Sequence, residues 1–283
     1  MRPVLHAGAR YRTASIHTAL WICCGLLCAC GRPVPVSPIV QDKIRFHFES
    51  TGVKDAEELA SFFPGAIQLL QGHFANPRLR SIVTGFDCDV RIYARPHAKA
   101  TSNLATVNTA IVEGVYRAEI HLLTTSAIDV RSRTHLGEQK DLAYNQRLLV
   151  HEYAAPLLDR ITRSKPKGWR FFSAPTWFVQ GYEEYLALTC SNEHSKSVTM
   201  ARYLGTLRAK PGRVRIGEGL QVESPYIGGA MLVRFMYEHF GAEKLYALLL
   251  APEPTFEAAA STHLTHYPDS FFEAWSTWLT SKG

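Results

Sequence analysis

The sequence predicts an α+β fold in which a small sheet comes first and a mainly helical part follows. Segments that alternate apolar and polar residues occur in the first half, whereas the second half repeats its apolar residues at helical spacing. The chain has 283 residues, 46% hydrophobic and 20% charged, which is typical of a globular protein that can bury a core.

The first part, residues 42–140, is predicted to be α/β. Residues 55–74 place apolar side chains on one side of a helix, with Pro64 inside it. Two apolar segments flank Glu113-Gly114, as in a hairpin or a bulged strand pair. The predicted strands are residues 43–49, 89–94, 109–112 and 115–124.

The second part, residues 141–283, is predicted to be mostly helical. Gly241 follows one helical segment in the position of a C-cap glycine, and Asp269 precedes another as an N-cap. The predicted helices are residues 141–163, 175–188, 195–208, 226–239, 242–250, 256–264 and 269–279, and residues 213–216 form a short extended piece.

The charge balance gives no indication of nucleic-acid binding. The formal net charge is +6, but three of the basic residues lie among residues 1–29, which contain no acidic residue. The remaining chain is only mildly basic, so we expect a mixed solvated surface and no nucleic-acid partner.

Residues 1–29 have the form of a secretory signal peptide of the lipoprotein type. A basic stretch precedes an apolar run of eleven residues, which is too short to cross a hydrocarbon core of about 30 Å. The run ends in Leu27-Cys28-Ala29-Cys30, which resembles a bacterial lipobox with Cys30 as the lipidated residue. We therefore expect an exported protein that is anchored to a membrane of the bacterial cell envelope; a plain signal peptide is the alternative.

Residues 30–41 contain three prolines and no apolar periodicity, so they are predicted to form a tether between the anchor and the folded domain. Cys88 and Cys190 are the two cysteines beyond this region. In an oxidising compartment they could pair, but two buried free thiols fit the sequence equally well, because spacing along the chain does not set their distance.

The segment that carries the chemistry contains His151 and Glu152, preceded by an apolar run in a predicted helix. This is the setting of the His-Glu-x-x-His zinc motif, in which two histidines on one helix face bind the metal and the glutamate activates a metal-bound water. The position four residues beyond His151 is Ala155, whose methyl group cannot bind zinc.

The His-Glu pair alone is a weak indication of a zinc motif, but a second segment supports it. This segment is residues 174–186, with the sequence Ala-Pro-Thr-Trp-Phe-Val-Gln-Gly-Tyr-Glu-Glu-Tyr-Leu. They closely resemble the second motif of the gluzincins, the zinc-metallopeptidase superfamily that includes the bacterial peptidase-MA-like families. Its pattern is Pro-x-Trp-Phe-x-Glu-Gly-x-Ala-x-Tyr, in which the glutamate is the third zinc ligand. The matching residues are Pro175, Trp177, Phe178, Gly181 and Tyr185.

The resemblance continues through residues 226–236, 239–245 and 271–275, so that residues 42–283 are similar to one peptidase-MA-like domain. It implies a zincin-like fold: a small mixed sheet, an active-site helix beneath it, a helical lobe and a groove between the two. It also implies a role for Tyr226, since many gluzincins use a tyrosine to stabilise the oxyanion.

Departures from the pattern affect the metal site most. Gln180 stands where the third ligand is expected, and a neutral amide is a weak zinc ligand. Pro156 is predicted to kink the helix beside His151. Glu183, one turn beyond Gln180, is a possible substitute ligand. The description favoured by the sequence is a hydrogen-bonded polar cluster in which Gln180 bonds to His151 or Glu152 without a metal.

The sequence therefore favours a catalytically inactive peptidase homologue that keeps its groove for binding a peptide or protein, or for scaffolding. In that reading no cofactor is expected, His151 is a remnant ligand and Glu152 a vestigial general base. The alternative is an active zinc peptidase with an unusual ligand set. A remnant fold with only a structural role also fits the sequence.

Overall fold

The computed structural model describes residues 37–83, 85–95, 105–131, 142–210, 214–217, 219–265 and 267–282. The chain divides into two units, Met1–Arg32 and Pro33–Gly283, and all the described residues belong to the second unit. The predicted signal peptide, Cys30 and residues 31–36 of the predicted tether lie outside the described residues.

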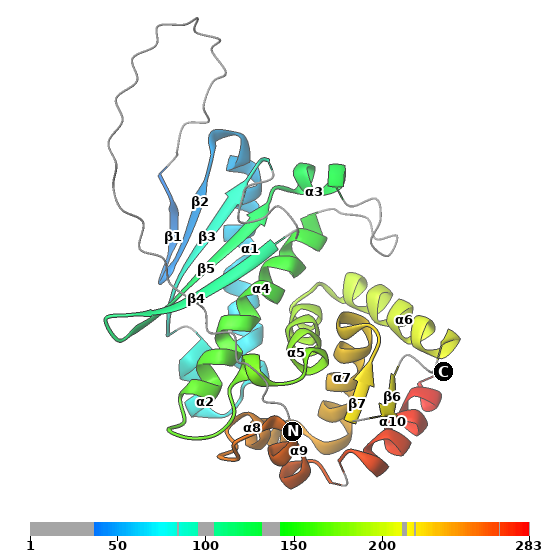
Figure 1. Ribbon diagram of the computed structural model, residues 1–283. Helices are drawn as coiled ribbons and strands as arrows, with labels where there is room; N and C mark the ends of the chain where they lie inside the picture. Colours follow the sequence, from blue (N-terminus) through cyan, green and yellow to red (C-terminus); the bar gives the residue numbers. More distant parts are fainter. Residues whose placement is uncertain are drawn as a thin grey trace, which may run out of the picture. The chain divides into compact units, whose positions relative to one another are not determined.

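A five-stranded mixed sheet occupies the first half of the domain (Figure 1). Its order is β1-β2-β3-β5-β4; the inner pairs β2–β3 and β3–β5 are parallel, and both edge strands are antiparallel to their neighbours. The strands are β1 (Ile39–Gln41), β2 (Ile44–Phe48), β3 (Asp87–Tyr93), β4 (Ala105–Val112) and β5 (Val115–Leu123). The predicted α+β class with a small mixed sheet is confirmed.

The alternation that predicted the strands reflects their two faces. In β2, Ile44, Phe46 and Phe48 are buried, whereas the polar residues between them lie on the opposite face. Below the buried face pack α1 (Val53–His73), which contacts β2, and α4 (Leu142–Arg163), which contacts β4 and β5. The shorter helices here are α2 (Pro77–Val83) and α3 (Thr125–Arg131), and a 3₁₀ turn, η1 (Ser50–Gly52), precedes α1.

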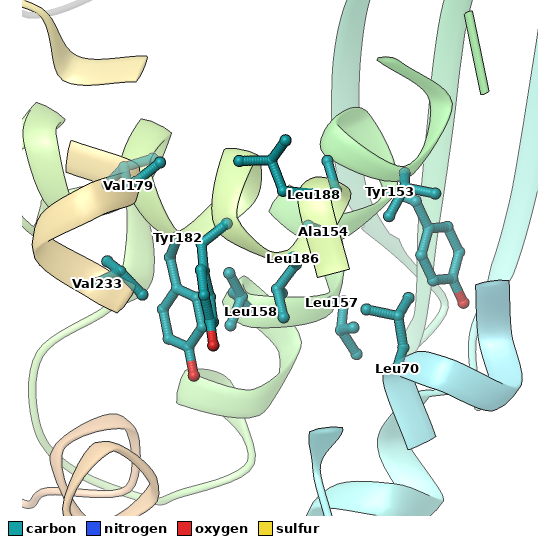
Figure 2. Close-up of a cluster of buried hydrophobic side chains, with 14 of the residues drawn as sticks. Leu70, Tyr153, Ala154, Leu157, Leu158, Val179, Tyr182, Leu186, Leu188 and Val233 are labelled. Atoms are coloured by element: carbon teal, nitrogen blue, oxygen red, sulfur yellow. The ribbon is translucent and has the colours of Figure 1, made fainter. Parts of the chain in front are cut away.

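The second half is built from helices around α5 (Thr176–Thr189), which packs against α4 and α7. Figure 2 shows this core, in which Leu70 of α1, Leu157 of α4, Leu186 of α5 and Val233 of α7 lie in one continuous apolar cluster. The remaining helices are α6 (Glu193–Ala209), α7 (Ala230–Phe240), α8 (Ala242–Leu249), α9 (Phe256–His263) and α10 (Asp269–Ser281).

Short connections complete this half. A two-stranded hairpin, β6 (Val214–Gly217) and β7 (Gly219–Val222), leads into a π-helical turn over Pro225–Gly229 that runs directly into α7. A 3₁₀ turn, η2 (Phe171–Ser173), precedes α5. Gly241 ends α7 with a φ of 84°, a left-handed value that favours glycine, as the predicted C-cap requires.

Two predictions need correction, and three elements were not predicted. The last three residues of the predicted tether form the edge strand β1, and the helices α2 and α3 and the strand β7 were not predicted. Asp269 is the first helical residue of α10 and its N-cap is Pro268. Pro156 lies inside α4, which continues for seven further residues, to Arg163.

A search of the described residues for a helix with the length and apolar character needed to cross a membrane found none.

Candidate functional site

The predicted site residues come together where α4, α5 and the π-helical turn meet. A close approach of two backbones makes this meeting possible. A Cβ atom added to Gly181 in α5 would lie 2.3 Å from the carbonyl carbon of Gly229, and one added to Gly229 would lie 2.2 Å from the carbonyl oxygen of Trp177. Only glycine fits at either position, which explains physically why both glycines of the motifs are present.

His151 of α4 lies between two consecutive carboxylates of α5. Its Nε2 atom is 3.3 Å from Oε2 of Glu183, and its Nδ1 atom is 3.2 Å from Oε2 of Glu184. All three residues are buried. Since a neutral imidazole can donate from only one nitrogen, contacts with carboxylates on both sides favour the doubly protonated, charged ring.

Glu184 was not singled out in the sequence, yet it has the most partners in the site. Its Oε1 atom accepts a hydrogen bond of 2.9 Å from the Tyr203 hydroxyl of α6 and lies 3.5 Å from Nε of Arg147. Arg147 also donates to Thr199 of α6 at 3.2 Å. Glu184 therefore connects three helices, α4, α5 and α6, through one buried carboxylate.

Gln180 bonds to a different partner from the one predicted. Its Nε2 atom donates to Oε2 of Glu183 at 2.9 Å, and neither His151 nor Glu152 is its partner. Glu183 thus receives Gln180 and His151 on the same oxygen atom, and it turns toward His151 as the sequence suggested.

Tyr226, in the π-helical turn, covers the outer side of His151. The two rings stack with centroids 5.6 Å apart and planes inclined by 29°. Tyr226 is 49% exposed, so one face of its ring contacts the imidazole and the rest meets solvent. Glu152, the neighbour of His151 on α4, is partly exposed.

The electrostatics of the site follow from burial and from the surplus of carboxylates. Burial lowers the pKa of His151, but the hydrogen bond to Glu184 and the charges of Glu183, Glu184 and Glu152 outweigh it and raise the pKa to about 9. Burial raises the pKa of Glu183 to about 8, against the opposing charge of His151. Burial also raises the pKa of Glu152.

Glu184 behaves in the opposite way. Burial would raise its pKa, but the hydrogen bond with His151 and the charge of Arg147 prevail and lower it. The ionised Glu184 is therefore the main counter-charge of the imidazolium, and the site at neutral pH is an ion-paired cluster.

These residues do not fit a zinc ion. Zinc sites in proteins use three or four protein ligands in a roughly tetrahedral arrangement around the metal. Here Ala155 is a buried methyl group, and the amide nitrogen of Gln180 is engaged with Glu183. Glu183 and Glu184 approach opposite nitrogens of the imidazole. Among the described residues, no group of three or more histidines, cysteines or acids is arranged to hold a metal.

The motif aromatic residues and the two cysteines singled out in the sequence lie in the protein interior. Trp177, Phe178 and Tyr185, which match the second motif, are buried in the core. Cys88 of β3 and Cys190, which follows α5, are both free buried thiols, which is the second of the two alternatives that the sequence left open.

Comparisons with protein-family models and with curated proteins gave no match for this chain. What the site can do is therefore argued from its own donors, acceptors and charges.

Proposed function

We propose that the chain is a zincin-like, peptidase-MA-like protein that lacks zinc catalysis and uses the region around His151 for binding. The observation that carries this proposal is the occupation of both ring nitrogens of His151 by carboxylates. A histidine whose nitrogens both donate to acids has no lone pair to offer a metal. Ala155 and the engaged amide of Gln180 remove the other two ligands.

The fold-level support is the combination of a small mixed sheet, a long helix beneath it that carries His151 and Glu152, and a second helix that carries the Trp-Phe-x-x-Gly segment. The close contact of Gly181 with Gly229 gives that segment a structural reason to persist after the ligands are replaced. Together they support a retained architecture with altered chemistry.

We also propose export and anchoring through Cys30, on the strength of the basic and apolar leader that precedes it. Expression of the full chain and of Cys30→Ser in a bacterium fed with labelled palmitate tests this. Label in the parent and none in the variant is the expected result. Equal label in both, or label in neither, would contradict lipidation at Cys30.

A second candidate function, an active zinc peptidase with His151 and Glu183 as its ligands, has one observation in its favour. The Oε2 atom of Glu183 is 3.3 Å from Nε2 of His151, so both groups point to the same place. The competing group there is the amide of Gln180, which already donates to that oxygen.

A cleavage assay separates the two functions. Purified protein is incubated with denatured casein, with zinc added in one arm and chelator in the other, and Glu152→Gln serves as the matched variant. The proposal predicts no cleavage above background in any arm. Chelator-sensitive cleavage that is lost in Glu152→Gln would establish the peptidase and contradict the proposal.

A further inference from the structure

The turn that joins β4 to β5 carries an exposed apolar cluster. Ile111 is 59% exposed, Val112 41% and Val115 45%, so three aliphatic side chains within five consecutive residues face water. Single apolar residues are common on protein surfaces, but a group of them on one projection indicates contact with another apolar body. We call Ile111, Val112 and Val115 the hairpin tip cluster.

The backbone holds this cluster on a regular projection. Glu113 and Gly114 form a two-residue turn in which both φ angles are positive, 52° and 78°, as in the type I′ turn of a twisted hairpin. The strand β3 begins opposite Arg117, so Val112 and Val115 lie beyond its end. Figure 1 shows the turn reaching out past the other strands of the sheet.

The cluster is apolar on both faces of the hairpin. Val112 and Val115 are directly opposite each other, so their side chains share the face that is polar elsewhere on β5. Ile111 is opposite Tyr116, whose hydroxyl donates to Asp159 of α4, and therefore lies on the face that the helices cover elsewhere. A protein packed flat on the sheet would cover only one face, whereas an apolar medium that the tip enters covers both.

The charged residues beside the cluster match the head groups of a phospholipid. Glu113 at the apex and Arg117, on the same face as Val115, are both exposed. A zwitterionic phospholipid carries an ammonium group and a phosphate, so the carboxylate and the guanidinium can each meet an opposite charge there. Hydrocarbon would remove the hydration of the Glu113 carboxylate, which limits the tip to the headgroup layer.

The tether is long enough for Cys30 and the hairpin tip to reach one membrane surface. The strand β1 begins at Ile39, nine residues after Cys30, and nine residues span at most about 30 Å. The register across the sheet places Ile39 level with Ile120, five residues from Val115 and three strands away, or about 20 Å from the tip. A lipid on Cys30 would keep the tip at high local concentration near the membrane, so a weak apolar contact suffices.

We propose that the hairpin tip cluster enters the headgroup layer of the phospholipid membrane to which Cys30 anchors the chain. The three aliphatic side chains then lose their contact with water, as those of interfacial membrane anchors do. The inference rests on the proposed lipid anchor and adds a second contact, which determines the end of the sheet that faces the membrane.

Photocrosslinking to labelled phospholipid tests the proposal in the full chain. Benzoylphenylalanine, which reacts on illumination with neighbouring C–H bonds, replaces Val112 in one protein and Val198 in another. Val198 is the matched control, because it is a valine that is 55% exposed on α6. The bacterium that expresses each protein is grown with labelled phosphate. A crosslinked phospholipid then carries the label, whereas an acyl group on Cys30 contains no phosphate.

We expect at least about five-fold more light-dependent phosphate label on the protein substituted at position 112 than on the one substituted at position 198. The double change Ile111→Thr and Val115→Thr keeps β-branched side chains but makes the rest of the cluster polar. It should lower the label at position 112 by at least about three-fold. Val40→Thr, at an exposed position of β1, is its control and should leave the label unchanged.

Equal label at positions 112 and 198, or no label at position 112, would overturn the inference. So would label that is undiminished in the double variant, or a crosslink from position 112 to a second copy of the chain or to another protein in place of phospholipid. Failure of the proposed anchor is measured separately, by comparing palmitate on the parent and on Cys30→Ser. A chain that carries palmitate but gains no phosphate label at position 112 loses only the further inference.

Discussion

At the scale of single residues, His151 connects two helices through both nitrogens of one ring. Its Nε2 atom faces Glu183 and its Nδ1 atom faces Glu184. The arrangement links α4 to α5 by a buried ion pair. Its stability depends on the carboxylates remaining opposite the imidazolium, because a buried charge without a partner is costly.

Glu184→Gln tests the importance of this ion pair. The variant removes the main counter-charge of His151 while keeping hydrogen-bonding groups for Tyr203, so we expect a loss of about 3 kcal/mol in the free energy of unfolding. Urea denaturation measures it. Glu273→Gln, at an exposed position of α10, is the control and should change stability by less than about 0.5 kcal/mol. A loss in Glu184→Gln no larger than the control's would contradict a structural ion pair.

The same cluster predicts how stability depends on pH. The pKa of His151 rises from 6.5 in the unfolded chain to about 9, and that of Glu183 from 4.5 to about 8. In both cases the folded state holds the proton more tightly, so stability is greatest below the unfolded pKa and falls as pH rises through the folded value. We expect the steepest decline between pH 6.5 and 8, where both groups contribute.

Glu183→Gln removes one of these two titrating groups. The variant should therefore lose less stability than the parent between pH 6.5 and 8, as measured by urea denaturation at a series of pH values. A parent protein whose stability rises over this interval, or a variant with a steeper decline than the parent, would show that the protonation states assigned here are wrong.

At the scale of elements, the contact of α5 with the turn before α7 sets the geometry of the site. Gly181→Ala would place a methyl group within 2.3 Å of the Gly229 backbone, so α5 and the turn that carries both Gly229 and Tyr226 would have to move apart. We expect a loss of more than about 4 kcal/mol or no folded protein. Thermal unfolding followed by circular dichroism measures the effect.

The matched control lies in the next helix. Gly205 of α6 has no atom within 4 Å of an added Cβ, so Gly205→Ala should stabilise the protein by about 0.5–1 kcal/mol through helix propensity alone. If Gly181→Ala were as well tolerated as Gly205→Ala, the close approach of the two backbones would be wrong.

Most of the long elements could be predicted from periodicity, because their buried faces repeat regularly. The helix over residues 141–163 and the one over 175–188 agree with α4 and α5 to within one residue at each end. The strand β1 follows three prolines and has only three residues, too few to show alternation. The seven-residue helices α2 and α3 are likewise too short for a clear apolar face.

The candidate site around His151 was only partly predictable, because some of its contacts depend on how helices distant in the sequence pack together. The motifs identified His151, Glu152, Gln180 and Glu183, which all lie in the cluster. Glu184 is four residues after Gln180, so helical spacing could have marked it. Its contacts with Tyr203 depend on how α6 packs against α5, and that packing leaves no pattern in the sequence.

At the scale of the whole molecule, the end of α1 docks onto the helical half through His73. Its ring stacks on Tyr237 at 5.1 Å and contacts the edges of Tyr182, Tyr185 and Tyr246, while the Tyr246 hydroxyl donates to the His73 carbonyl. Its Nε2 atom is buried with no hydrogen-bond partner among the described residues. A charge on this ring would therefore be poorly accommodated.

Acid conditions test this docking. Burial lowers the pKa of His73 from 6.5 to about 4, so the unfolded chain binds the proton more readily and stability falls as pH drops from 6.5 towards 4. The slope from one such group is at most about 1.4 kcal/mol per pH unit. His73→Phe should lose less stability than the parent over this interval in urea denaturation. An identical acid dependence in the two proteins would exclude His73 as the cause.

The core and the candidate site differ in their chemistry. The sheet, the helices beneath it and the glycine contact form a continuous apolar core, whereas the groups around His151 form a buried ion-paired cluster. The proposal of a protein that binds and does not cleave rests on this contrast between a retained architecture and an altered donor set.

The metal content of the purified protein tests the central claim most directly. The folded chain is expressed with zinc in the medium, purified without chelator and analysed for metals against protein concentration. We predict far less than one zinc per chain, and no change in the midpoint of thermal unfolding when chelator is added. Near-equimolar zinc whose removal lowers that midpoint would contradict the proposal that the site around His151 lacks zinc.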